Sequence, residues 1–303
     1  GISCFTALLF AIHPVQVETV CWISASKIVL STFFYLSALI CYIQYMRNSK
    51  WQYLLASVVS SILAMGCKEQ SVIIVPCLLL FDWMLFKRNM RSLKVYIEKV
   101  YYLIPAIAIF IVTLVANKNT GEEIIGYTIV DRFIFLCYSS FKYLLISAIP
   151  FKLSYLYPFP FQVGEKIPMA LWIYPFVILF IGYVIYLNRR KPLLVFCTLF
   201  FILHLLPVLH VIPLPRYVVA ADRYLYIPYI AFAIGLSILS YHLYERQRKW
   251  ILYAGFLYCS YLCVYTAGYA PAWKNSDTLK EHFKEVLKKR ETNLSINFKH
   301  EKQ

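Results

Sequence analysis

The ionisable residues of this chain lie in short polar segments between long apolar runs. One such segment extends from His13 to Lys27 and contains a single carboxylate, Glu18. An apolar run ends at Ile12 and another begins at Ile28. Ionisable side chains so close to hydrocarbon are costly, so they are kept either for chemistry and binding or as charges that fix helix ends. Both explanations are open for this segment.

Further polar segments hold the other residues that could do chemistry. They are Lys68 and Glu69; Glu122, Glu123, Asp131 and Arg132; and Arg216, Asp222, Arg223 and Tyr224. Carboxylates that alternate with Lys and Arg at a membrane surface suit a phosphate-bearing substrate. The cations would bind the phosphate, and a carboxylate would act as general base for an acceptor hydroxyl. The alternatives are a neutral ion pair between Lys68 and Glu69 that only orients helices, and an interfacial anchoring role for Tyr224.

No residue pattern predicts a metal site or a disulfide framework. The nine cysteines lie mostly inside apolar runs, and no Cys-x-x-Cys pair occurs. His204 and His210 have no third ligand at a suitable spacing, so we expect hydrogen-bonded packing rather than metal ligation. The pattern requires no cofactor, and it leaves open a divalent metal ion.

The composition indicates an all-α, polytopic membrane protein. The chain is 61% hydrophobic and 15% charged, whereas soluble domains are roughly 45–50% apolar and about 25% charged. Backbone groups in lipid must bond within their own segment, which favours helices. Apolar segments of spanning length, which we expect to be helices, are predicted at 28–46, 52–66, 71–86, 100–116, 168–187, 192–209, 224–241 and 250–268, and two of them are short. The net charge of +15 is assigned to basic loops and not to nucleic-acid binding.

Lys and Arg in the short connections predict the orientation. The basic connections contain Arg47 and Lys50; Lys87, Arg88, Arg91, Lys94 and Lys99; Arg189, Arg190 and Lys191; and Arg246, Arg248 and Lys249. If these connections are cytoplasmic, the loops 13–27, 67–70, 117–167 and 210–223 are extracytoplasmic, as is the C-terminus. If residues 129–149 crossed the membrane, the last two basic connections would face the extracytoplasmic side. We therefore expect an interfacial helix at Asp131–Ile149 within a long outer loop.

The two ends of the chain differ from the rest. The first apolar run, Ile2–Ile12, is too short to span a bilayer, so we expect a fragment that lacks its N-terminal part. From Trp273 onward the chain is polar, with Leu279, Phe283, Val286 and Leu287 at helical spacing and with Thr278 and Glu281 spaced as a capping box. The predicted domains are a membrane domain at 1–272 and a soluble amphipathic helix and tail at 273–303.

Several of these segments resemble motifs of one family, and they follow one another in the same order as in that family. His13–Lys27 is similar to the His-Pro-x-x-x-Glu-x-Val-x-Trp-Ile-Ser-x-x-Lys signature of the transmembrane and tetratricopeptide-repeat O-mannosyltransferase-like family. Ala221–Pro228 resembles its Ala-Asp-Arg-Tyr-x-Tyr-x-Pro segment. Cys67–Gln70 and Tyr155–Pro160 resemble its Lys-Glu-Gln/Met and Tyr-Pro-rich segments.

The resemblance implies a C-type glycosyltransferase fold in a multi-pass membrane protein. Such enzymes move a sugar, here mannose-like, from a polyprenyl-phosphate donor to a hydroxyl on the outer face, often of protein Ser or Thr. The implied partners are the polyprenyl-phosphate-linked sugar, a protein or glycan acceptor, and membrane lipid. A tetratricopeptide array commonly follows, and the tail helix lies where it would begin. The Trp-Ile-Ser sequence is closer to that of bacterial members of the family, which implies a bacterial inner membrane rather than the endoplasmic reticulum.

The residues expected to form the site follow from the motifs. The catalytic set is His13, Glu18 and Asp222; the substrate-binding set is Lys27, Lys68, Glu69, Arg132, Arg223 and Tyr224. In this scheme His13 shapes its loop, and Glu18 acts on the acceptor or on the electrostatics of the site. Lys68, Arg132 and Arg223 bind the donor phosphate. Asp222 and Glu69 orient the cations.

Two departures from the family pattern favour an alternative. The family usually has Asp after the Lys of its first signature, where this chain has Ile28. The family's acidic residue of the first outer loop would lie upstream of Gly1. The alternative is a catalytically inactive scaffold that recruits partners through its tail. A transporter of lipid-linked sugar is the last candidate, because the chain has no internal repeat and its charges lie in loops.

Overall fold

The computed structural model describes residues 1–118, 127–154, 156–210, 218–246, 248–282 and 284. Within these ranges every regular element is a helix, as the composition predicts. Glu122, Glu123, Tyr155, Arg216, Phe283, Val286 and Leu287 fall outside the described residues.

The predicted apolar runs all form helices. They are α3 (Ser26–Asn48), α4 (Trp51–Cys67), α5 (Ile74–Met84), α6 (Leu93–Lys118), α8 (Ile173–Leu187), α9 (Pro192–Leu205), α10 (Pro228–Arg246) and α11 (Arg248–Tyr269). Four segments of the described chain are long and apolar enough to cross a membrane: Ile23–Asn48, Leu93–Ala116, Met169–Leu187 and Lys249–Trp273. Trp51–Cys67 and Pro192–Val208 are shorter apolar helices.

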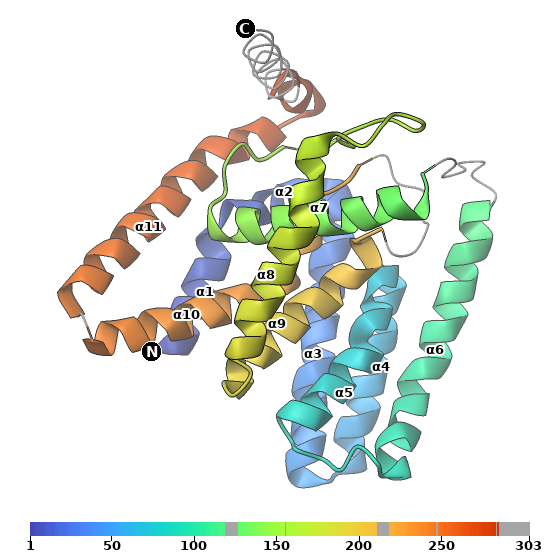
Figure 1. Cartoon of the computed structure of the whole chain (residues 1–303). Helices are drawn as coiled ribbons and strands as arrows, with labels where there is room; N and C mark the ends of the chain where they lie inside the picture. The colour runs from blue at the N-terminus through green and yellow to red at the C-terminus, as the bar shows by residue number, and fades with distance from the viewer. Residues whose placement is uncertain (119–126, 155, 211–217, 247, 283, 285–303) are drawn as a thin grey trace, which may run out of the picture.

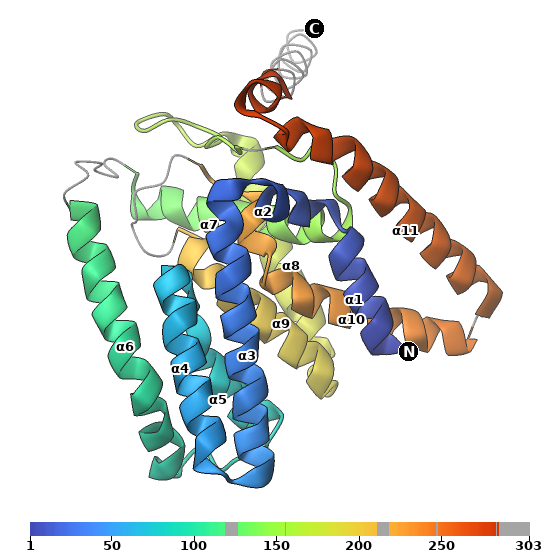
Figure 2. The same ribbon diagram turned by 180° about the vertical axis from the view of Figure 1, so that it is seen from behind.

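Short helical segments connect the long helices at one end of the bundle. After α1 (Ile2–Ile12), the chain bends by 55° into η1 (Pro14–Gln16) and α2 (Val17–Cys21), and η2 (Ile23–Ala25) leads into α3. The remaining short segments are η3 (Glu69–Ile73), η4 (Met169–Trp172), η5 (Leu206–Val208), η6 (Asp222–Leu225) and η7 (Ala270–Trp273). The turns α3–α4 and α5–α6 lie at the opposite end of the bundle from α2 (Figures 1 and 2).

Helix α7 (Ile129–Ala148) runs across the direction of α3 and α4 rather than parallel to them (Figures 1 and 2). It is not among the segments that are long and apolar enough to cross a membrane. A capping box starts it: the Thr128 backbone N donates to Asp131 Oδ2 at 2.7 Å, and Asp131 N donates to Thr128 Oγ1 at 3.2 Å. The helix predicted at Asp131–Ile149 is thus present, and it begins two residues earlier.

The tail helix is capped differently from the prediction. The Thr278 backbone N donates to Asn275 Oδ1 at 2.8 Å, and Asn275 N donates to Thr278 Oγ1 at 3.2 Å. Asn275 is therefore the N-cap, and Thr278 occupies the third helical position instead of the cap. Leu279 packs against the core, as the apolar spacing predicts.

Candidate functional site

Glu18 and Arg223 form an ion pair although they lie 205 positions apart. Arg223 Nη1 donates to Glu18 Oε1 at 2.5 Å, and the Arg223 backbone N donates to Oε2 at 2.9 Å. The Glu18 side chain is fully buried, whereas that of Arg223 is 19% exposed. The guanidinium carbon lies 5.6 Å from the ring centre of Trp22 and 5.1 Å from that of Tyr224. Two hydrogen bonds and two aromatic faces thus fix Arg223 in place.

His13 turns the chain so that Glu18 reaches η6. It is the N-cap of η1, where its Nδ1 accepts a hydrogen bond from the Val15 backbone N at 3.3 Å and Pro14 occupies the first helical position. Its buried ring packs on Tyr229 with 4.2 Å between ring centroids. The predicted role of His13, shaping this segment, agrees with that geometry.

A small polar hollow lies beside the ion pair and brings several predicted site residues together. Lys68, Arg223 and Tyr224 line it, with Ile28, Ser31, Thr32, Ser71 and His204 among the other lining residues. Its volume is about 40 Å³. One water molecule needs at least roughly 10–15 Å³ measured in this way. The hollow can therefore hold a few waters or one small anionic group, but not a sugar ring.

Lys68 reaches this hollow while paired with Glu69. Its Nζ lies 2.7 Å from Glu69 Oε1, so the ion pair considered from the sequence is present. Burial raises the pKa of the Glu69 carboxyl, but Lys68 and, more weakly, Lys27 outweigh that effect and lower the pKa overall. Lys27 itself is exposed at the start of α3. An ammonium held by one partly exposed carboxylate retains donors for a second anion.

His204, Ser31 and Ser71, which line the hollow, have hydrogen-bond partners of their own. His204 Nδ1 lies 2.7 Å from the Phe200 carbonyl oxygen, which can only accept, so Nδ1 carries the proton. Nε2 then accepts from Tyr35 Oη at 2.8 Å. The hydroxyls of Ser31 and Ser71 are 2.7 Å apart, which joins α3 to η3. The expected packing role of His204 is confirmed.

Asp222 differs from the prediction that it orients a cation. Its Oδ1 accepts a hydrogen bond from Tyr157 Oη at 2.8 Å, and its Oδ2 has no hydrogen-bond partner among the described residues. The carboxylate that holds the Arg223 guanidinium is Glu18. Burial, followed by the nearby Glu18 carboxylate, raises the pKa of Asp222 well above its ordinary value.

The structure does not bring Arg132 to the hollow. Arg132 follows Asp131 in the first turn of α7, and among the described contacts none joins its side chain to Lys68 or Arg223. The acidic neighbour that sequence inspection grouped with it, Asp131, closes the capping box of α7. Asp131 is therefore next to Arg132 because it caps the start of α7, and not because the two residues share a binding site.

A second polar cluster, at the far end of α3, was missed by sequence inspection. Lys99 Nζ lies 2.6 Å from Asp82 Oδ2, and Tyr42 Oη donates to Asp82 Oδ1 at 2.6 Å. Arg88 Nη1 lies 2.5 Å from Glu98 Oε2. Lys99 and Arg88 were counted as loop charges that set the orientation, whereas both are paired here. The available signal was Asp82, a carboxylate inside an apolar run.

Among the described residues, no group of three or more His, Cys, Asp or Glu side chains is arranged to hold a metal ion. No protein-family model matches the chain, and no match was found among curated proteins or among solved structures.

Proposed function

We propose that this protein is a membrane glycosyltransferase that moves a mannose-like sugar from a polyprenyl-phosphate donor to a hydroxyl, such as that of a protein Ser or Thr, on the extracytoplasmic face. The observation that carries the proposal is the shared hollow of Lys68 and Arg223 beside the buried Glu18. Two cations that face one small polar space at the ends of apolar helices suit a phosphate attached to a lipid.

The hollow fits the phosphate and leaves the sugar outside. Lys68 and Arg223 are the phosphate-binding cations, and the Ser31–Ser71 pair adds hydroxyls at the floor. Arg223 is fixed by Glu18, so its charge needs little reorganisation when the anion binds. Tyr224 lines the same hollow, and on this proposal it contacts the donor.

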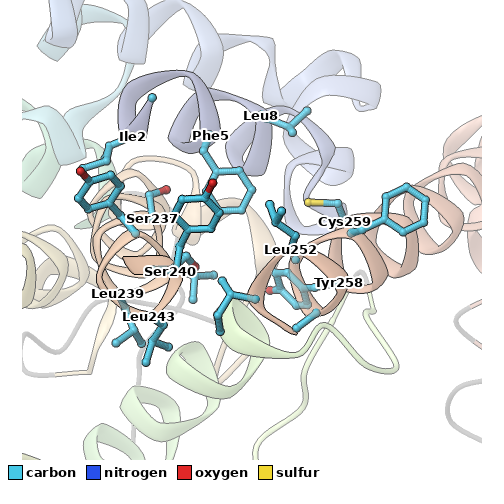
Figure 3. Close-up of a pocket in the computed structure, with 18 of the residues that line it drawn as sticks. Ile2, Phe5, Leu8, Ser237, Leu239, Ser240, Leu243, Leu252, Tyr258 and Cys259 are labelled. Atoms are coloured by element: carbon cyan, nitrogen blue, oxygen red, sulfur yellow. The ribbon is translucent and has the colours of Figure 1, made fainter. Parts of the chain in front are cut away.

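An apolar groove supports the lipid part of the donor. The groove has a volume of about 670 Å³ and lies between α1, α10 and α11, where Phe5, Leu8, Leu236 and Leu252 are among its lining residues (Figure 3). Helix α10 begins at Pro228, which lines the hollow, and Phe232 lines the groove. At 1.5 Å per residue these positions are about 6 Å apart along the axis. On this proposal the phosphate of the donor occupies the hollow and its lipid chain occupies the groove.

Sugar transfer in membranes that contain the protein tests the proposal. The substrates are a polyprenyl-phosphate mannose and a Ser/Thr peptide, and rates are normalised to folded protein. Glu18→Gln is expected to lower transfer at least about tenfold, because Arg223 loses its charged partner and a charge-assisted bond contributes about 1.5–3 kcal/mol. Glu69→Gln is the matched control and is expected to keep most of the rate, since Lys68 remains. Full turnover of Glu18→Gln would show that the assigned role is wrong.

One observation favours the scaffold alternative. Ile28, which stands where the family usually has an acid, lines the hollow and packs with Ala25 and Tyr226. On this alternative the hollow binds the phosphate lipid but lacks the carboxylate needed to activate an acceptor. Donor binding without any transfer by the wild-type protein would favour the scaffold, whereas transfer would exclude it.

A further inference from the structure

Two carboxyl groups and a single guanidinium meet at the contact of α2 with η6. Glu18 accepts one hydrogen bond from the Arg223 side chain and one from its backbone N–H. The Glu18 carboxylate is also close enough to Asp222 to raise the pKa of that acid, so the two acids are neighbours. Asp222 is 1% exposed and has no ion-pair partner among the described residues. The pair of acids therefore carries one more negative charge than the guanidinium can balance.

Among the residues that the structure describes, none supplies the missing positive charge to Asp222 by direct contact. Tyr157 donates to Oδ1, and the Lys142 ammonium of α7 lies 4.1 Å from the centre of the Tyr157 ring. Tyr265 and Tyr269 of α11 are also near Asp222, and both are neutral at ordinary pH. Lys142 thus acts on Asp222 from a distance. Burying an ionised carboxylate without a paired cation is far more costly than binding a proton.

The geometry points to Asp222 as a neutral carboxylic acid that carries its proton on Oδ2 and positions the Glu18–Arg223 pair. Oδ1 serves as the carbonyl oxygen and accepts from Tyr157, while Oδ2, which receives no hydrogen bond from a donor among the described residues, holds the proton. A neutral Asp222 does not compete with Glu18 for Arg223. Through Tyr157, whose backbone oxygen accepts from Val219 N at 2.9 Å, it also ties the outer loop to η6. This inference does not depend on sugar transfer.

Infrared spectroscopy of the purified full chain in lipid nanodiscs tests the proposal without any assay of activity. The wild type at neutral pH is expected to show the C=O stretching band of a protonated carboxylic acid, and Asp222→Asn is expected to lose it. Asp131→Asn removes an acid of the α7 capping box and serves as the control that keeps the band. A spectrum in which Asp222→Asn leaves the band unchanged would overturn the proposal.

Two further measurements cover the case of altered folding. Tyr157→Phe keeps the ring but removes the hydrogen bond to Oδ1, so the band is expected to move to higher frequency; an unmoved band counts against the proposal. Asparagine is a neutral isostere of the protonated acid, so Asp222→Asn is expected to melt within a few degrees of the wild type. Unfolding of Asp222→Asn would mean that the site needs a negative charge, and the proposal would be wrong.

Discussion

At the scale of single residues, two neighbouring acids differ because their partners differ. Burial raises the pKa of the Glu18 carboxyl, and two hydrogen bonds from Arg223, one of them charge-assisted, oppose that effect and favour its charged form. Asp222 is equally buried, and its carboxyl has the neutral hydroxyl of Tyr157 as its hydrogen-bond partner among the described residues. The same residue chemistry thus yields a counter-ion in one place and a neutral hydrogen-bonding group in the other.

The Glu18–Arg223 pair is expected to show strong coupling in a double-mutant cycle. Glu18→Gln and Arg223→Gln should each lower stability by about 3 kcal/mol, because each leaves a charge without its partner at a largely buried position. The double variant should lose much less than the sum. Thermal unfolding of the four proteins in one detergent measures this, and additive losses would show that the two side chains are not coupled.

The raised pKa of Asp222 predicts a specific pH dependence. The unfolded chain releases this proton near the ordinary aspartate pKa, about 3.9, whereas the folded chain retains it to higher pH. The stabilisation from the bound proton is therefore complete below about pH 3.9 and is lost as the pH rises toward the folded-state value. Asp222→Asn does not titrate, so the stability of the wild type relative to this variant should fall across that interval. A difference that is flat or rises with pH contradicts the assignment.

The candidate site was predictable in part from residue types and spacing. Polar segments between apolar runs identified Glu18, Lys68 and Arg223 as neighbours of one membrane surface. The partner of each charge was not predictable, because Glu18 and Arg223 are distant in sequence and Asp222 is adjacent to Arg223. Adjacent residues of a helical turn project in different directions, so sequence neighbours need not share a contact.

At the scale of elements, apolar runs predict the helices but not what joins them. Each predicted run contains a helix, since only a helix satisfies a backbone in hydrocarbon. Boundaries were less predictable where a polar side chain decides them, as with Asn275 in the tail helix. Asp82 was missed because its apolar surroundings dominate the local hydropathy.

The Asp82 cluster should be a main stabilising contact between α3, α5 and α6. Asp82→Asn leaves the buried Lys99 ammonium without its closest carboxylate, and we expect a loss of about 3 kcal/mol. The exposed Asp277→Asn is the control and should be neutral. Adding Lys99→Met to Asp82→Asn should restore part of the stability, because the unpaired charge is removed. Thermal unfolding without any difference between the Asp82 and Asp277 variants would contradict this role.

At the scale of the whole molecule, helix α2, which carries Glu18, and the α3–α4 and α5–α6 turns lie at opposite ends of the bundle (Figures 1 and 2). Helix α3 has 23 residues, which corresponds to about 35 Å and exceeds a hydrocarbon core of about 30 Å. The exposed residues Ser26 and Ser49 mark its two ends. The orientation can therefore be measured on one helix.

Cysteines introduced by Ser26→Cys and Ser49→Cys should label from opposite faces of the membrane. With a membrane-impermeant maleimide in intact cells, Ser26→Cys is expected to react, and Ser49→Cys only after permeabilisation. The variants are made in a Cys21→Ser background, because Cys21 is exposed near Ser26. Labelling of both positions from the same face would exclude α3 as a membrane-spanning helix.

Binding of a polyprenyl monophosphate to the purified protein in nanodiscs tests the central claim most directly. Lys68 is suited to this test because its only described ion pair, with the partly exposed Glu69, contributes at most about 1 kcal/mol to stability. Lys68→Gln is expected to weaken binding at least about tenfold through loss of a charge-assisted contact. The exposed Lys274→Gln should bind like the wild type. Equal affinities for the wild type and Lys68→Gln would contradict the assignment of the hollow as a phosphate site.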